Sequence, residues 1–387
     1  MDLLTLGTNL RRLRIAAGRS QAEVAKGAGI TRAAYRNIES GAASPRVNTI
    51  ASIARALEVD MGDLFSPVRE LRRVRFRALK RMNTREQVLA EVSRWLEDYR
   101  EVEAMVGEDE GFAFGPVASE VSGMAPGPAR ARKAAEQARR VVKLGPNELI
   151  RDICGLLEDN GVKVFTPEVA SEGFFGLSVS GGDDGGPAVV VNVWDRVSVE
   201  RWIFTAAHEL GHLLLHLTSN QVDESTEDKG QEVEANTVAS HLLMPEETFR
   251  KEWEEARGLG LVDRVLKVKS IFRVSYATVL YRVSTTHPMG ERIWPVFAGA
   301  YKARFGHGLA RLDEPDGLLP EDFRQGSPAP GRADEPEHLR RWGFVHDRLS
   351  RLVRKAVEEE KISLSRAAEI SRVDLETMRA RANSWLE

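Results

Sequence analysis

Apolar residues recur at helical spacing along most of the chain, and between residues 160 and 195 they change to short continuous runs. In the first part of the chain, this spacing marks short helices separated by turns of glycine and small polar residues. The predicted helices cover residues 6–17, 20–27, 31–39, 46–57 and 60–65. Ser20 and Glu23 form the Ser-x-x-Glu pattern of a capping box, and Thr31 is placed to cap the next helix. We therefore expect residues 1–66 to form an all-α domain.

A basic segment and one long amphipathic helix follow. Residues 67–82 contain seven Arg or Lys residues against one Glu, which suits either a solvated surface or a phosphate backbone. From residue 83 onwards, apolar residues alternate four and three apart in a heptad seam of Val88, Val92, Trp95, Tyr99, Val102 and Val106. We interpret this helix as a candidate for dimerisation. Packing on its own chain is the alternative, because the seam is short for an isolated coiled coil. Together, residues 67–106 are expected to form a connector.

Residues 107–130 are rich in Gly, Pro, Ala and Ser. This composition is typical of a flexible linker. If the protein is cut in its middle, this segment is the expected place.

The short apolar runs predict strands at residues 161–165, 174–180 and 188–194, after helices at 131–142 and 149–157. The last two strands are expected to pair as a hairpin. The edge of the strand at 188–194 could bind an extended substrate as an added strand. Ser198 can cap the helix that follows. Residues 131–285 are therefore expected to form an α+β domain with a small sheet.

The helix that begins after Ser198 carries the pattern His-Glu-x-x-His. Residues four apart share one helix face, so His208 and His212 can present two imidazole nitrogens to one metal ion. Glu209 lies one step around the helix, where a carboxylate can act as general base toward a water molecule. This is the zincin arrangement, and it predicts a Zn²⁺ site with Glu209 as the catalytic group.

Catalytic zinc needs a third protein ligand, and a second predicted helix at 230–244 can supply it. Glu232 and Asn236 share one face of that helix, so Glu232 is the candidate ligand and Asn236 can orient a histidine from behind. Glu234 lies about 160° further around and is the weaker candidate. His216 is expected to pack near the site without binding the ion. His241 could reach a cleft, although a structural role is the preferred interpretation.

The C-terminal region, residues 286–387, is predicted to be mainly helical, with an exposed Gly- and Pro-rich loop at 306–337. Two further segments, at 261–283 and 362–379, scan as helix-turn-helix units. Neither has a basic surround comparable to the N-terminal one, so we interpret both as packing units.

Composition and charge limit the location of the protein and the kinds of partner that it is expected to bind. The chain has 387 residues, a hydrophobic share of 42% and one cysteine, Cys154, which is expected to lie in a core. A single cysteine excludes an intrachain disulfide framework and favours a cytoplasmic location. No signal peptide or membrane span is predicted. The net charge of −3 combines +9 over residues 1–82 with −12 over the rest, so only the N-terminal part is expected to bind a polyanion.

The N-terminal helices closely resemble the XRE family of Cro- and phage-repressor-like DNA-binding domains. The residues that carry the resemblance include Ser20-Gln21-Ala22-Glu23, Gly29-Ile30-Thr31 and Tyr35-Arg36-Asn37. The resemblance implies double-stranded operator DNA as a partner, bound by a homodimer. By resemblance, the residues that face DNA are Gln21, Thr31, Arg32, Ala33, Arg36 and Asn37.

The paired blocks His208-Glu-Leu-Gly-His212-Leu-Leu-Leu-His216 and Glu232-Val-Glu-Ala-Asn236 resemble the ImmA/IrrE family of zinc metallopeptidases. Members of that family cleave repressors or promote their cleavage, and some are fused to an XRE domain. The resemblance implies that His208, His212 and Glu232 bind Zn²⁺ and that Glu209 is the base.

Two hypotheses follow for the whole chain. In the first, it is a DNA-binding transcriptional regulator whose zinc endopeptidase domain hydrolyses a bond in a partner repressor or in itself, as a stress switch. In the second, it is a repressor whose peptidase-like domain binds zinc or a ligand as a sensor and cuts nothing. Retention of Glu209 favours the first hypothesis, because a degenerate site would have little need of it.

Overall fold

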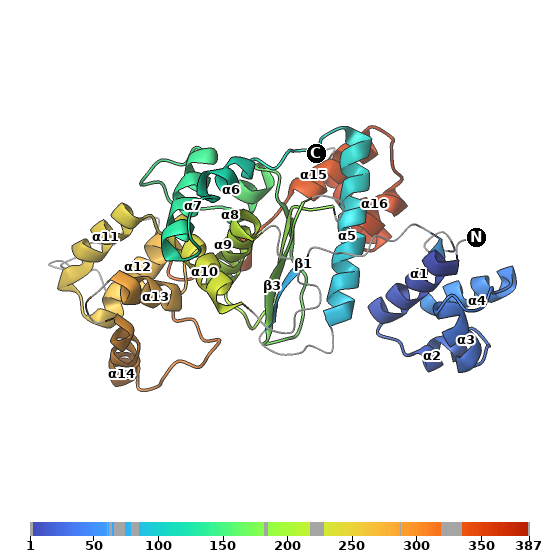
Figure 1. The fold of residues 1–387 in the computed structure, drawn as a ribbon, viewed down its shortest axis with the longest axis horizontal. Helices are drawn as coiled ribbons and strands as arrows, with labels where there is room; N and C mark the ends of the chain where they lie inside the picture. Colours follow the sequence, from blue (N-terminus) through green and yellow to red (C-terminus); the bar gives the residue numbers. More distant parts are fainter. Residues whose placement is uncertain are drawn as a thin grey trace.

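The structure is a computed structural model that describes residues 3–59, 61, 64–65, 74–78, 85–181, 185–216, 228–286, 288, 290–318 and 335–385. It shows an all-α head at one end, a small sheet between layers of helices, and a helical lobe at the other end (Figure 1). The predicted multidomain fold, with an all-α head, an α+β body and a helical C-terminal region, is confirmed. The predicted helix at 60–65 and the basic segment at 67–82 lie largely outside the described residues.

The head contains four described helices: α1 (Leu3–Ala16), α2 (Gln21–Gly27), α3 (Arg32–Glu39) and α4 (Val47–Leu57). The predicted capping box is confirmed: Ser20 accepts from the Glu23 backbone N–H, and the Glu23 carboxylate accepts from the Ser20 N–H. Thr31 caps α3 by accepting a hydrogen bond from the Ala34 backbone N–H. These helices enclose their own hydrophobic core, which includes Leu6, Leu10, Val24, Tyr35, Ile38 and Ile53.

The body is built on four strands: β1 (Val74–Ala78), β2 (Lys163–Phe165), β3 (Phe174–Val179) and β4 (Ala188–Val191). Their order is β1-β3-β4-β2. The predicted hairpin of β3 and β4 is confirmed, since the two strands pair antiparallel. The prediction of a free edge on β4 is wrong, because β2 pairs with it in parallel on the side away from β3.

Both faces of the sheet are covered. In β4, Val189 and Val191 contribute to the core shared with helix α9 (Val199–Leu215), whereas Ala188 and Val190 contribute to the core on the opposite face. This explains the continuous apolar run in the sequence, because a strand that is buried on both sides has no polar alternation.

Helix α5 (Arg85–Val106) covers the face of the sheet opposite α9. All six residues of its heptad seam are buried against the sheet and against α15 (Arg348–Glu358) and α16 (Leu364–Ile370) of the same chain. The dimerisation prediction for this seam is therefore wrong, and the alternative of packing on its own chain is confirmed. The periodicity of α5 shows that this face is buried, but it does not reveal that the C-terminal helices α15 and α16 pack against it.

The segment at 107–130 contains helix α6 (Gly115–Val121) and the start of α7 (Pro128–Val141). Phe114, Val117 and Val121 are buried in the core of the body. The prediction of a flexible linker is therefore wrong. Pro116 and Pro128 lie in the first positions of α6 and α7, where proline is favoured, so they mark helix starts in a packed region.

The remaining helices complete the body and the lobe. They are α8 (Ile153–Glu158), α10 (Lys229–Leu243), α11 (Glu246–Glu255), α12 (Leu261–Phe272), α13 (Tyr276–Thr286), α14 (Ile293–Phe305) and α17 (Leu375–Ser384), with short 3-10 turns at Ala256–Gly258, Gly290–Arg292 and Arg341–Gly343. The pair α12–α13 and the helix α16 bury apolar side chains in the cores of the body, as expected for packing units. Much of the predicted loop at 306–337 lies outside the described residues. None of the described helices is long and apolar enough to cross a membrane.

Candidate metal centre and DNA-binding surface

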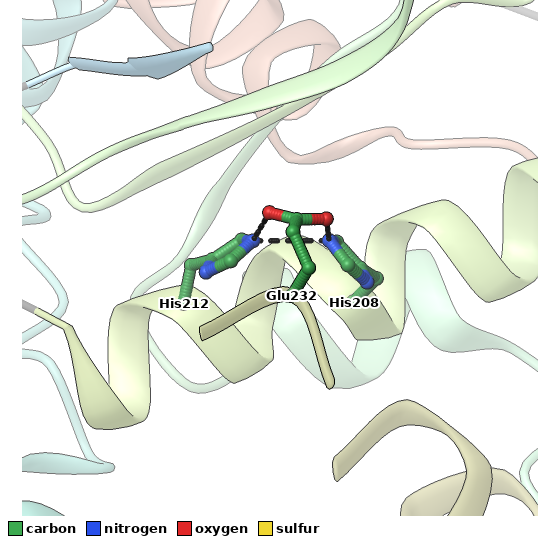
Figure 2. A group of neighbouring side chains, drawn as sticks. All are labelled: His208, His212 and Glu232. Atoms are coloured by element: carbon green, nitrogen blue, oxygen red, sulfur yellow. Dashed lines mark hydrogen bonds and ion pairs between the residues drawn. The ribbon is translucent and has the colours of Figure 1, made fainter. Parts of the chain in front are cut away.

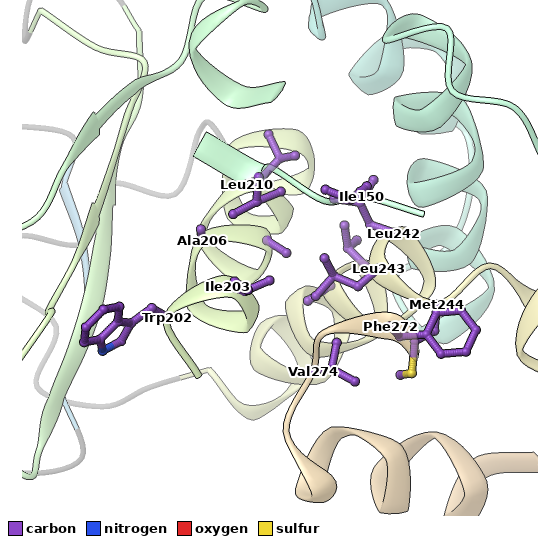
Figure 3. Close-up of a cluster of buried hydrophobic side chains, with 14 of the residues drawn as sticks. Ile150, Trp202, Ile203, Ala206, Leu210, Leu242, Leu243, Met244, Phe272 and Val274 are labelled. Carbon is purple, nitrogen blue, oxygen red and sulfur yellow. The ribbon is translucent and has the colours of Figure 1, made fainter. Parts of the chain in front are cut away.

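Helix α9 holds the first part of the candidate site. Ser198 caps its N-terminus by accepting a hydrogen bond from the Arg201 backbone N–H. The rear face of α9, with Ile203, Ala206 and Leu210, packs in a hydrophobic cluster with Leu242 and Leu243 of α10 (Figure 3). This packing fixes the rotation of α9 about its axis, which decides where its histidines point.

His208, His212 and Glu232 converge on one point between α9 and α10 (Figure 2). The two Nε2 atoms are 3.0 Å apart, and the Glu232 oxygens lie 3.4 Å from His208 Nε2 and 3.2 Å from His212 Nε2. Ligand atoms that surround zinc tetrahedrally at 2.0–2.1 Å are separated by roughly 3.3 Å. The two nitrogens and one carboxylate, at this spacing, fit a zinc ion.

A close approach of the two helices brings Glu232 within reach. Asp228 caps the N-terminus of α10, so Glu232 lies in its first turn. A Cβ atom on Gly211 would lie 3.1 Å from the Ala235 Cα and 3.1 Å from the Val238 Cβ. The glycine therefore lets the backbones of α9 and α10 pack without an intervening side chain.

Each histidine is oriented from behind by a second group. His208 Nδ1 lies 2.9 Å from Asn236 Oδ1, which is the position expected for Asn236. His212 Nδ1 lies 3.0 Å from His216 Nδ1, and His216 Nε2 lies 3.0 Å from Glu234 Oε2. If the Nε2 atoms face a metal, both ligand histidines carry their proton on Nδ1. His212 then donates to His216, and His216 Nε2–H donates to Glu234.

Glu234 also ties this chain of hydrogen bonds to the start of α7. Its carboxylate accepts from Arg130 Nε at 2.8 Å and from the Gly127 backbone N–H at 2.7 Å. Sequence reasoning placed Glu234 only as a weak ligand candidate and did not foresee Arg130. The spacing of four residues between His208, His212 and His216 places His216 on the same helix face as the two candidate ligands. This spacing does not identify Glu234 as the partner of His216.

The electrostatics of the site favour ionised Glu232. Without a metal ion, burial opposes ionisation, but hydrogen bonds donated by the Nε2–H groups of His208 and His212 outweigh it and hold the pKa of Glu232 well below its usual range. A bound ion would take the place of those two protons and would also favour the ionised carboxylate. An ionised carboxylate and two neutral imidazoles are the forms in which these side chains bind a divalent ion.

Glu209 is fully buried on α9, beside the histidines and close to strand β3. A Cβ on Gly176 of β3 would lie 3.3 Å from Glu209 Oε1, 2.6 Å from Thr205 Cγ2 and 2.7 Å from the Val190 carbonyl oxygen. No larger residue than glycine fits between the strand and the helix at this point. The backbone of β3 consequently forms one wall beside Glu209.

Two other residues singled out in the sequence belong to packing. His241 hydrogen bonds to Arg282, whose guanidinium also binds Glu246 at 2.6 Å, and burial lowers the pKa of His241 to about 3. This supports the structural role for His241. Cys154 is buried in the core of the body, where burial raises the pKa of its thiol.

In the head, α2 and α3 form the two helices of a helix-turn-helix. Five of the six residues expected to face DNA lie exposed on the surface of α3 and at its start: Thr31, Arg32, Ala33, Arg36 and Asn37. Gln21 is half-buried, and its amide donates to Glu39 Oε1 at 3.0 Å. The exposed face of α3 thus has the side chains to reach a groove, while Gln21 is held partly inside the head.

Comparisons with known proteins agree with this division. Residues 157–284 match the family model of the IrrE N-terminal-like domain, and residues 10–64 match a helix-turn-helix family. No curated protein matches the chain.

Two solved structures share 10–11% identity with the chain. Bacillus thuringiensis PlcR, in complex with the peptide PapR7 and DNA, shows 11% identity over 78% of this chain and 98% of its own, with a TM-score of 0.16. The competence regulator ComR from Streptococcus vestibularis, in its apo form, shows 10% identity over 80% of this chain and 100% of its own, also with a TM-score of 0.16. The chain thus combines a segment that matches a helix-turn-helix family, at residues 10–64, with a segment that matches the IrrE N-terminal-like domain, at residues 157–284.

Proposed function

We propose that this protein is a cytoplasmic DNA-binding regulator whose body is a zinc-dependent endopeptidase. The observation that carries the proposal is the convergence of His208, His212 and Glu232 on one point, with Glu209 on the same helix. The substrate would be a partner repressor or the chain itself, so that proteolysis changes gene expression under stress.

The residues of the chain would divide the work as follows. His208, His212 and Glu232 would hold the ion, and Asn236 and His216 would fix the two imidazole rings. A bound zinc ion supplies Lewis-acid polarisation of a carbonyl group and lowers the pKa of a water molecule. Glu209 would accept a proton from the attacking water and return it to the leaving nitrogen.

In the head, the exposed face of α3 would bind the major groove. Arg32, Arg36 and Asn37 have side chains suited to base edges, whereas Gln21 and Thr31 suit phosphates. The partial burial of Gln21 agrees with a positioning contact at the edge of the interface.

The test compares the parent, Glu209→Gln and His307→Ala, each loaded with zinc and added to a soluble cell extract. His307 is an exposed histidine outside the metal cluster, so its variant is the matched control. New protein N-termini, identified by mass spectrometry, should appear with the parent and His307→Ala but not with Glu209→Gln. The same N-termini in all three samples, or none in any, would favour the non-proteolytic repressor.

A further inference from the structure

The edge of the sheet beside Glu209 is filled by a segment from the connector between head and body. Strand β1 pairs antiparallel with β3, in a register that runs from Val74 opposite Val179 to Arg77 opposite Gly176. No other described strand lies on that side of β3. Val74, Phe76 and Ala78 alternate with Arg75 and Arg77, which is the two-residue period of a strand. The alternation does not name the partner strand, so the pairing with β3 is a finding of the structure.

The register brings β1 to the catalytic end of the sheet. Gly176 of β3 lies against the side chains of Glu209 and Thr205. Its direct partner on β1 is Arg77. Neighbouring strands are about 4.8 Å apart. The backbone of β1 at Arg77 is thus one strand spacing from the part of β3 that borders Glu209.

This edge is the one at which an extended peptide could reach the site as an added strand. β4 is enclosed between β3 and β2. The other edge of the sheet is formed by β2, which is separated from β3 by β4. Without β1, the outer backbone groups of β3 would be unpaired beside Glu209, and unpaired strand edges bind extended peptides through main-chain hydrogen bonds. A substrate that uses this edge must take the place of β1.

We propose that the outer edge of β3 binds the substrate as an extended strand and that β1 occupies it as an autoinhibitory segment, which must leave before a substrate enters. The inference rests on the proposed peptidase function and adds its regulation. β1 belongs to the segment that joins the head to α5. The position of the head and the occupancy of the edge by β1 are therefore coupled through this segment.

The pairing also favours a blocking role for β1 over a role as substrate. The register shifts between Arg77 and Ala78, so that Phe175 has no opposing residue on β1. Such a bulge interrupts the ladder and bends the strand. The interruption lies next to Gly176, where a substrate would have to be held in register for its bond to be cut.

The first experiment measures whether displacement of β1 opens the edge. A fluorescein-labelled peptide with the sequence of residues 72–80 is titrated against the full-length chain, and binding is followed by fluorescence anisotropy. All proteins carry Glu209→Gln, so that the peptide is not cut. Alternate residues of an antiparallel strand donate to its neighbour, so the pair Arg75→Pro and Phe76→Pro removes at least one ladder hydrogen bond of β1.

The proline variant should bind the peptide at least tenfold more tightly than the otherwise unchanged chain. The control pair Arg75→Val and Phe76→Val removes the same side chains but keeps a strand-forming sequence, and it should bind as weakly as the unchanged chain. A scrambled peptide of the same composition excludes attraction by charge alone. Equal affinity of all three proteins for the peptide would overturn the proposal.

A second variant works in the opposite direction and covers the case in which the proline pair does not fold. Val74 and Val179 face each other in the register, and directly opposed residues have Cα separations that a disulfide can span. With Val74→Cys and Val179→Cys, oxidation should abolish peptide binding and reduction should restore it to the level of the unchanged chain. Binding that is unaffected by oxidation would contradict the proposal.

Neither assay depends on catalysis, so their failure is distinct from failure of the peptidase proposal. If peptide binding behaves as expected but no new N-termini form, the edge binds peptides in a non-proteolytic protein. If the active chain cuts itself within residues 74–78, β1 is a substrate and the autoinhibitory role is wrong.

Discussion

Helices α3 and α9 begin alike and present their functional residues in opposite directions. Each starts at a hydroxyl cap, Thr31 in the head and Ser198 in the body. In α3, the candidate DNA contacts are exposed and the buried face contains Tyr35. In α9, the candidate catalytic residues are themselves buried, with partners behind them.

In the head, substitutions of the candidate functional residues are expected to affect binding without affecting stability. In the body, substitutions of the candidate functional residues are expected to affect both activity and stability. A change to an exposed residue of α3 would remove a candidate contact with DNA and leave the core of the head intact. A change at the metal centre disturbs a set of buried polar groups that hold each other in place, and unsatisfied groups of that kind are costly. The following predictions, from the largest effect to the smallest, test whether the two regions differ in this way.

The largest effect is expected from removal of a metal ligand. Zinc binding in four-ligand structural sites contributes about 10–16 kcal/mol, so loss of one protein ligand in His208→Ala should cost several kcal/mol. Zinc content after dialysis, measured by mass spectrometry, should fall to near zero, and zinc should no longer raise the melting temperature. The control His307→Ala should retain the metal. Unchanged zinc in His208→Ala would contradict the ligand assignment.

Removal of the groups behind the ligands should weaken zinc binding less. Outer partners of metal ligands typically affect affinity by about 10–100-fold. We therefore expect Glu234→Ala and His216→Ala each to lower zinc affinity within that range, measured by competition with a chromophoric chelator. Glu136→Ala, an exposed carboxylate on α7, is the control and should have no effect. If the variants of Glu234 and His216 bind zinc as tightly as the parent, the hydrogen-bond chain does not support the site.

A third prediction concerns pH and a buried acid of the body. Burial raises the pKa of Glu158 to about 7, although its carboxylate accepts the backbone N–H groups of Asp347 and Arg348. Between pH 4.5 and 7, the folded state keeps a proton that the unfolded state has lost, so this group makes stability fall as pH rises. Glu158→Gln should reduce that loss by on the order of 2 kcal/mol, measured by urea unfolding from pH 5 to 7.5.

The head offers the matched control for the pH measurement. Burial opposes the change, but hydrogen bonds from Arg14 and Gln21 lower the pKa of Glu39 below its usual range. The stability contributed by Glu39 is present above its unfolded pKa and is lost as pH falls, so Glu39→Gln should not flatten the profile from pH 5 to 7.5. Equal profiles for the parent and Glu158→Gln would contradict the raised pKa of Glu158.

The smallest effect on the folded chain is expected from Arg36→Ala. Exposed substitutions usually change the free energy of unfolding by less than about 0.5 kcal/mol, whereas a lost arginine contact to a base costs about 1–3 kcal/mol of binding. Affinity for a duplex selected from a random pool by the parent should fall accordingly. Arg55→Ala, an exposed arginine on α4, should bind nearly as the parent does. A large loss of stability in Arg36→Ala would remove the contrast between head and body.

The sequence was sufficient for features that depend on local spacing. The capping box at Ser20, the helix of His208 and His212, and the hairpin of β3 and β4 all arise from residues within one element or in adjacent ones. The common face of Glu232 and Asn236 on α10 was also readable from their spacing of four residues.

Features that depend on distant segments were missed or wrong. The seam of α5 gave no sign that α15 would return from the far end of the chain to cover it. The pairing of β1 with β3, the role of Arg130, and the enclosed position of β4 depend in the same way on contacts between segments far apart in sequence. Periodicity shows which face of an element is buried, but it does not identify the distant segment that covers that face.

At Gly211 the separation between α9 and α10 is set by the absence of one methyl group, and Glu232 reaches toward the histidines from across that separation. A Cβ at this position would lie 3.1 Å from the Ala235 Cα and from the Val238 Cβ, so the helices would have to move apart by roughly a few tenths of an ångström. Metal–ligand distances tolerate only about 0.2 Å. Gly211→Ala would therefore loosen the candidate site although position 211 supplies no ligand, so a residue without a side chain would contribute to the affinity for the ion.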